Sequence, residues 1–200
     1  SLHSMLTQVQ PSTSIYITSE RIEDINMNWL DYDIIIIAVD SIKVRKYIIN
    51  AIKKDLDKYV TFDPSVLPLV IDGRLNATSY EVFTISGVSP DESISNRRYF
   101  ESQLDAYKSS LIDEESLGEG SCTMKQTYFF GAMIGARIVN IITNYLSNLA
   151  YKKQCVSEDK PFIMLYEVPF HIREIGDAML LVKEDAEEYK KKMISYKKEE

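Results

Sequence analysis

The sequence is poor in the residues that build disulfide frameworks and zinc sites. Its 200 residues include two cysteines, Cys122 and Cys155, and two histidines, His3 and His171. Two cysteines do not indicate a disulfide framework, and reduced thiols in a cytoplasmic setting are the simpler interpretation. These four residues cannot build a cysteine-rich zinc site either, so we expect no structural zinc.

Long apolar runs and a concentrated basic surface are also missing. The longest apolar candidate, residues 128–136, is stopped by Arg137, whereas a membrane span needs roughly 18 apolar residues. No secretory signal is recognisable. The net charge of -7 argues against a generic nucleic-acid binder, because such proteins neutralise phosphates with a basic surface. We therefore expect a cytoplasmic protein that binds neither nucleic acid nor a membrane.

The aliphatic content is concentrated in a pattern typical of a parallel sheet. Residues 33–40 form a continuous aliphatic run bounded by acids, as a buried central strand requires. Helical spacing begins at Ser41, where either Ser41 or Asp40 can cap the helix. Further strands are expected at 67–72 and 80–85. This order predicts an α/β, Rossmann-like fold, with a partly parallel sheet flanked by helices and antiparallel strands toward the C-terminus.

The remaining segments complete one domain over residues 1–175, which we expect to be incomplete at its N-terminus. The start at Ser1-Leu2, without an initiator methionine, suggests a piece of a longer protein.

Gly131 and Gly135 lie four apart in a long helix, where close packing on the sheet is favoured over dimerisation. Cys155 is expected in a linker or on the surface. The other expected elements are a short strand at 14–18, a crossover loop without regular structure at about 87–121, a helix at 124–151, a strand at 162–168 and a charged helix or tail at 176–200.

Asp40 is the strongest candidate for a functional residue. Ligands of open α/β sheets gather beyond the carboxyl ends of the strands, and Asp40 stands at such an end, just before a helix. A carboxylate there can hold a magnesium ion that organises nucleotide phosphates. A helix cap is the alternative role for Asp40, and the pattern alone favours neither.

Four segments, taken in order, resemble enzymes of the ThiF/MoeB and ubiquitin-activating type. The string Asp33-Ile-Ile-Ile-Ile-Ala-Val-Asp40-Ser41-Ile-Lys-Val-Arg45 is similar to that family's hydrophobic strand, acidic-polar pair and following arginine. Pro68-Leu-Val-Ile-Asp-Gly73-Arg-Leu resembles the next strand. Gly120-Ser-Cys122-Thr precedes a long apolar helix, as the family's crossover cysteine does, and Val9-Gln-Pro11 resembles its Asn-Pro-like turn. The resemblance covers most of residues 7–150.

The resemblance implies an adenylating enzyme that uses ATP and magnesium to activate the C-terminal carboxylate of a ubiquitin-like or sulfur-carrier protein, as a homodimer or heterodimer. The family's catalytic, magnesium-organising aspartate maps onto Asp40 and its arginine onto Arg45, which makes Asp40, Ser41 and Arg45 the cofactor-binding candidates. Ser41 departs from the family, which has asparagine there. Cys122 matches a cysteine that some members use in sulfur or thioester chemistry. Packing in a loop is its alternative role.

The family's Gly-rich nucleotide turn has no counterpart in the sequence. The closest glycines, Gly118 and Gly120, lie far downstream of the relevant strand and lack a third member. Without a phosphate cradle the chain alone should have little or no adenylating activity, because orientation and charge stabilisation supply most of the acceleration. A non-catalytic interaction module, or a subunit of a heterodimeric activating enzyme, is therefore the alternative. A nicotinamide-dependent oxidoreductase ranks lower, since its fingerprint is also missing.

Overall fold

The computed structural model describes residues 12–58, 67–75, 79–90, 93–111 and 126–175. These residues form an α/β fold around a mixed sheet with the strand order β1-β2-β3-β4. Strands β1 (Ile34–Ile37) and β2 (Leu69–Leu75) are parallel, whereas β3 (Ser79–Ile85) and β4 (His171–Ile175) continue the sheet in antiparallel fashion. The predicted fold class, partly parallel with antiparallel strands toward the C-terminus, is confirmed.

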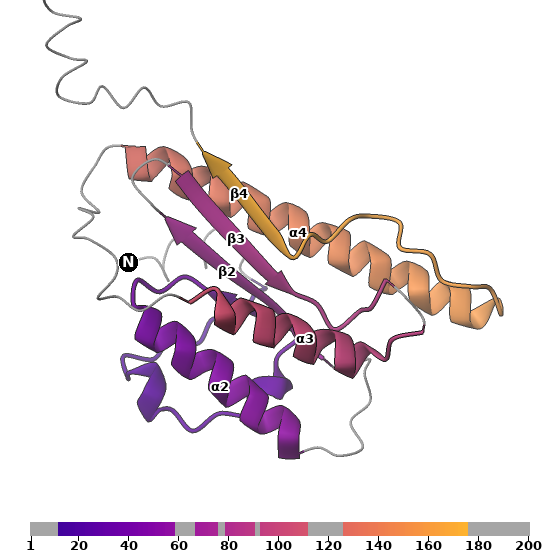
Figure 1. Cartoon of the computed structure of the whole chain (residues 1–200), viewed down its shortest axis with the longest axis horizontal. Helices are drawn as coiled ribbons and strands as arrows, with labels where there is room; N and C mark the ends of the chain where they lie inside the picture. Colours follow the sequence, from indigo (N-terminus) through magenta and orange to yellow (C-terminus); the bar gives the residue numbers. More distant parts are fainter. Residues whose placement is uncertain (1–11, 59–66, 76–78, 91–92, 112–125, 176–200) are drawn as a thin grey trace, which may run out of the picture.

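Helices cover both faces of this sheet (Figure 1). Helices α2 (Ile42–Lys58) and α3 (Asn96–Ser109) lie on one face, and the long helix α4 (Gln126–Ser157) lies on the other. The predicted helix at 124–151 therefore continues to Ser157. None of the helices in the described ranges combines the length and apolar character needed to span a bilayer.

The central strand β2 separates two hydrophobic cores. Its alternating side chains point to opposite faces, because successive residues of a strand do so. Val70 packs with Ile52 and Leu104 beneath α2 and α3, whereas Leu69 and Ile71 pack against α4. All of these side chains are almost fully buried. Burial on both faces explains why this part of the sequence is continuously aliphatic.

Among the described residues, strand β1 is the outermost strand on its side of the sheet and spans only Ile34–Ile37. The prediction of a buried central strand from the aliphatic run at 33–40 is therefore wrong in the position of the strand. Its register with β2 runs from Ile34 opposite Leu69 to Ile37 opposite Asp72. Among the described residues no strand pairs with its outer edge. Ile36 is 50% exposed, and the α4 contacts fall on β2 and β3. The exposure of Ile36 reflects a face of the sheet that α4 leaves partly uncovered at β1.

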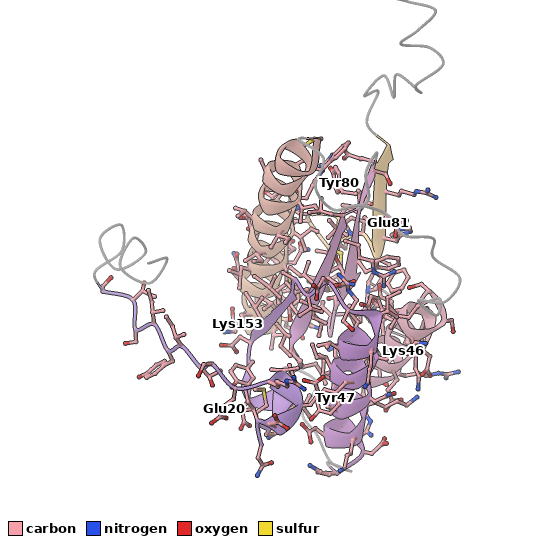
Figure 2. All side chains as sticks on the ribbon, turned by 90° about the vertical axis from the view of Figure 1, so that its left-hand side faces the viewer. Glu20, Lys46, Tyr47, Tyr80, Glu81 and Lys153 are labelled. Carbon is pink, nitrogen blue, oxygen red and sulfur yellow. The ribbon has the colours of Figure 1, made fainter. Side chains whose placement is uncertain are left out.

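Two of the predicted strands are wrong. Residues 14–18 are not in a strand: Tyr16 is 93% exposed, and residues 12–20 run away from the sheet (Figure 2). Residues 162–168 are irregular, and the strand begins only at His171. Their backbone hydrogen bonds go to a side chain instead of to a neighbouring strand: the amides of Leu165 and Tyr166 donate to the Asn148 side chain at 3.0 Å each. Alternating apolar residues become a strand only where a neighbouring strand is available to pair.

The expected crossover loop contains a helix that the sequence analysis missed. Helix α3 buries Phe100, Leu104 and Tyr107 at helical spacing, and Ser95 caps it by accepting a hydrogen bond from the Arg98 amide at 3.3 Å. Frequent polar residues concealed this apolar face. Residues 112–125, with Cys122, and the predicted tail at 176–200 lie outside the described residues.

Two expectations about α4 are also corrected. Cys155 lies inside the helix and is 2% exposed, so its predicted position in a linker or on the surface is wrong. Gly131 and Gly135 are exposed, and a Cβ atom at either would meet nothing within 4 Å. The predicted packing of these glycines against the sheet is therefore wrong. The close approach to α4 occurs instead at Gly73 of β2, where a Cβ would lie 2.9 Å from Ile134.

Candidate functional site

Asp40 lies in the short turn between β1 and α2. The strand ends at Ile37 and the helix begins at Ile42. Ser41 caps the helix, since its Oγ accepts a hydrogen bond from the Val44 amide at 3.4 Å. The Asp40 side chain is exposed, and within the described part of the chain its carboxylate makes no hydrogen bond or ion pair. Of the two candidate caps the molecule uses Ser41.

Arg45, in the first turn of α2, connects the Asp40 turn to strand β2. Its side chain is buried and forms an ion pair through Nε with Asp72 Oδ1 at 3.0 Å. One terminal nitrogen donates to the Asp40 carbonyl oxygen and the other to the Gly73 carbonyl oxygen, each at 3.4 Å. The guanidinium group therefore contacts both the turn that follows β1 and the interior of β2.

Asp72 is the centre of a buried group that we call the Asp72 cluster: Arg45, Asp72, Arg74 and Tyr107. The carboxylate is 2% exposed and accepts three hydrogen bonds. One comes from Arg45, and Oδ2 accepts the other two, from Arg74 Nε at 2.6 Å and from the Tyr107 hydroxyl at 2.8 Å. A buried carboxylate is tolerated because charged donors replace its water. The cluster ties β2 to α2 and α3.

Two positive charges face one negative charge in the Asp72 cluster. The Arg74 guanidinium also lies over the ring of Phe83, 4.1 Å from its centroid, and 4.8 Å from that of Tyr107. Burial opposes the charge on Arg74, but its hydrogen bonds with Asp72 and Tyr107 outweigh this and raise its pKa. Burial and the nearby Asp72 charge raise the pKa of Tyr107 well above its usual range. Tyr107 therefore stays a neutral donor at any physiological pH.

His171 lies away from the Asp40 turn. It belongs to β4, at the opposite end of the strand order from β1, and its ring stacks on Phe83 with centroids 4.1 Å apart. Its Nε2 lies 3.9 Å from Glu81. The sheet order thus separates His171 from Asp40, so the histidine is not placed to act as a general base there.

A metal site built from protein ligands alone is not found in the part of the chain that the structure describes. No group of three or more His, Cys, Asp or Glu side chains able to hold a metal occurs within the described ranges. Magnesium is commonly held by one or two carboxylates together with waters and nucleotide phosphates. A single exposed carboxylate such as Asp40 fits that mode and does not fit a site built entirely from protein ligands.

The structure brings together three of the four residues singled out from the sequence. Asp40, Ser41 and Arg45 share one turn, while Cys122 lies outside the described residues. Sequence reasoning missed the roles of Asp72, Arg74 and Tyr107. A signal did exist for Asp72: an acid at the end of an aliphatic strand must find buried partners.

Comparisons of the chain with family models, curated proteins and solved structures gave no significant match.

Proposed function

We propose that the chain is part of an ATP-dependent adenylating enzyme of the ThiF/MoeB, ubiquitin-activating type. Its substrate would be the C-terminal carboxylate of a ubiquitin-like or sulfur-carrier protein. The observation that carries the proposal is the exposed Asp40 carboxylate, without a partner among the described residues, at the carboxyl end of β1. Ligands of α/β sheets bind at that end of the strands.

In this proposal Asp40 holds the magnesium ion that accompanies ATP. Magnesium held by Asp40 would supply neutralisation of the phosphate charge during adenylyl transfer. A carboxylate oxygen of the carrier protein attacks the α-phosphorus, a new P–O bond forms, and the bond to the departing pyrophosphate breaks. The product is a mixed anhydride whose carbonyl carbon accepts a later nucleophile. Cys122 remains a candidate for that nucleophile.

The chain supplies only part of such a site. It has no Gly-rich turn, and its lysines and arginines do not stand at the family's phosphate-binding positions. We therefore expect little or no adenylation by this polypeptide alone, with the phosphate cradle supplied by another segment or subunit. The outer edge of β1, which pairs with no other strand in the described ranges, is where an additional strand would join the sheet.

A second candidate is favoured by that same edge. A non-catalytic ThiF-like module, or the non-catalytic subunit of a heterodimeric activating enzyme, would use the unpaired side of β1 to bind its partner. In this case the Asp40 carboxylate would not affect adenylation. The two candidates therefore differ in what happens when Asp40 is replaced.

ATP–pyrophosphate exchange tests the proposal. The native gene product that contains this sequence is assayed with candidate carrier proteins, and the Asp40→Ala variant is compared with Asp57→Ala. Both side chains are exposed on or beside α2, at opposite ends. Asp40→Ala should lower the exchange rate by about 10²-fold or more, because it removes the carboxylate that would hold the magnesium ion at the reacting phosphates. Asp57→Ala should leave the rate within about twofold.

Undiminished exchange in Asp40→Ala would remove Asp40 from the mechanism. Exchange that requires a second polypeptide and is insensitive to Asp40→Ala would instead support the non-catalytic subunit.

A further inference from the structure

We infer that Arg45, anchored by Asp72, positions the turn that presents Asp40. Arg45 would thus act through Asp40 instead of contacting the nucleotide. The inference rests on the proposed function for the catalytic importance of Asp40. Its structural part, the control of the turn by Arg45, stands on the geometry alone.

The hydrogen bonds of Arg45 run in three directions. Nε is directed to the Asp72 carboxylate at 3.0 Å, and the two terminal nitrogens reach the carbonyl oxygens of Asp40 and Gly73 at 3.4 Å. This use of a planar fork is specific to arginine. A lysine ammonium keeps the charge next to Asp72 but has one nitrogen, which cannot span the same acceptors.

The Arg45 contact differs from the hydrogen bonds that Ser41 accepts, because it reaches the backbone of Asp40 itself. On its C-terminal side, the Ser41 oxygens receive the Val44 and Arg45 amides at 3.4 and 3.1 Å. These bonds fix the first turn of α2 but do not reach Asp40. Among the described residues, the only hydrogen bond found to the Asp40 backbone comes from the Arg45 guanidinium. Without this hydrogen bond the Asp40 carboxylate would be held less precisely. A misplacement of a catalytic group by about 1 Å can lower the reaction rate about 10²-fold.

Asp72 is itself held in place, and this makes Arg45 an effective anchor. Its Oδ2 accepts from Arg74 and Tyr107, which leaves Oδ1 to Arg45. Asp72 also stands opposite Ile37, the last residue of β1, in the parallel register. The anchor therefore connects the interior of β2 and α3 to the end of the strand that leads to Asp40.

The test compares Arg45→Lys and Arg45→Gln with Asp55→Asn as a matched control. Asp55 is a buried carboxylate of the same helix, which accepts a hydrogen bond from the Trp29 amide at 2.9 Å. Its replacement also weakens a buried polar contact but leaves the Asp40 turn untouched. Arg45→Lys preserves the charge facing Asp72, so this variant should still fold. Arg45→Gln removes that charge and should have the larger effect on the turn.

The first readout is amide hydrogen exchange of the 200-residue chain, followed residue by residue. In Arg45→Lys the amides at the start of α2, such as that of Val44, should exchange about tenfold faster or more, because the turn opens locally. Amides of β2 and β3 should be unchanged. Asp55→Asn should not affect the turn selectively. Unchanged exchange at the turn in both Arg45 variants would overturn the inference.

The second readout is ATP–pyrophosphate exchange by the native gene product. Arg45→Lys should lower kcat by about 10- to 100-fold, with KM for ATP within about threefold of wild type. A large rise in KM with kcat retained would mean that Arg45 contacts ATP directly, which also overturns the inference. If Asp40→Ala leaves exchange activity intact, the proposed function fails. The hydrogen-exchange readout then still decides whether Arg45 controls the turn.

Discussion

Replacing Asp72 by asparagine tests the Asp72 cluster. The side chain is 2% exposed and accepts hydrogen bonds from Arg45, Arg74 and Tyr107. Asparagine has nearly the same shape, but it leaves two guanidinium groups without their negative partner and turns an amide NH₂ group toward donors. Breaking a buried ion pair on one side costs about 3–5 kcal/mol. This is a large part of the roughly 5–15 kcal/mol that holds a typical domain together.

The free energy of unfolding can be measured with urea and the fluorescence of Trp29. Trp29 is the single tryptophan and is 6% exposed within the core beneath α2. With an m-value of about 2 kcal/mol/M, the unfolding midpoint should fall by about 1.5–2.5 M. The control, Asp105→Asn, removes a surface ion pair with Lys53. The Lys53 side chain is 40% exposed and the Asp105 side chain is 59% exposed. That change should cost about 0.5 kcal/mol or less.

A loss below about 1 kcal/mol in Asp72→Asn, similar to that of the control, would refute the reasoning. It would mean that water or a rearranged contact replaces the charge of Asp72 in solution. An unchanged m-value is also required, because a changed one would place part of the effect in the unfolded state.

The other predictions concern backbone space and pH. Gly131→Ala should raise the free energy of unfolding by about 0.5–1 kcal/mol through helix propensity, because its Cβ meets nothing within 4 Å. Gly87→Ala should lower it by about 1–3 kcal/mol, because its Cβ would lie 2.4 Å from that of Leu67. Thermal or urea unfolding checks both, and a destabilising Gly131→Ala would instead indicate a covered helix face. Burial, followed by the charge of Asp33, raises the pKa of Tyr145 to about 12. The pKa of Tyr145 in the folded protein exceeds its pKa of about 10 in the unfolded chain, so the contribution of Tyr145 to the free energy of unfolding is complete below pH 10. This contribution is lost between about pH 10 and 12, and the loss is at most about 2–3 kcal/mol. Tyr145→Phe should therefore lose less stability than wild type between about pH 9 and 11.5, and an equal loss would contradict the assignment.

Local patterns were enough to predict the elements that bury one continuous apolar surface. The aliphatic run became β1, the helical spacing after Ser41 became α2, and the long apolar segment became α4. Their period and length indicate burial of an apolar face, although Ile36 of β1 is 50% exposed. The place of Asp40 after β1 followed from the same pattern. Polar residues spread through α3 made its apolar face harder to recognise.

The Asp72 cluster was decided only by the tertiary structure. Its hydrogen bonds join Arg45 to Asp72 across 27 positions and Tyr107 to Asp72 across 35. No local pattern contains such pairings, because they depend on how α2 and α3 pack on the sheet. The same dependence explains why residues 162–168 alternate like a strand yet hydrogen-bond to Asn148. The sequence by itself determined that Asp40 follows the strand β1, because an aliphatic run predicts a strand from local side-chain burial alone. The packed fold decided that Ser41 caps the helix and that Arg45 reaches both the Asp40 backbone and Asp72.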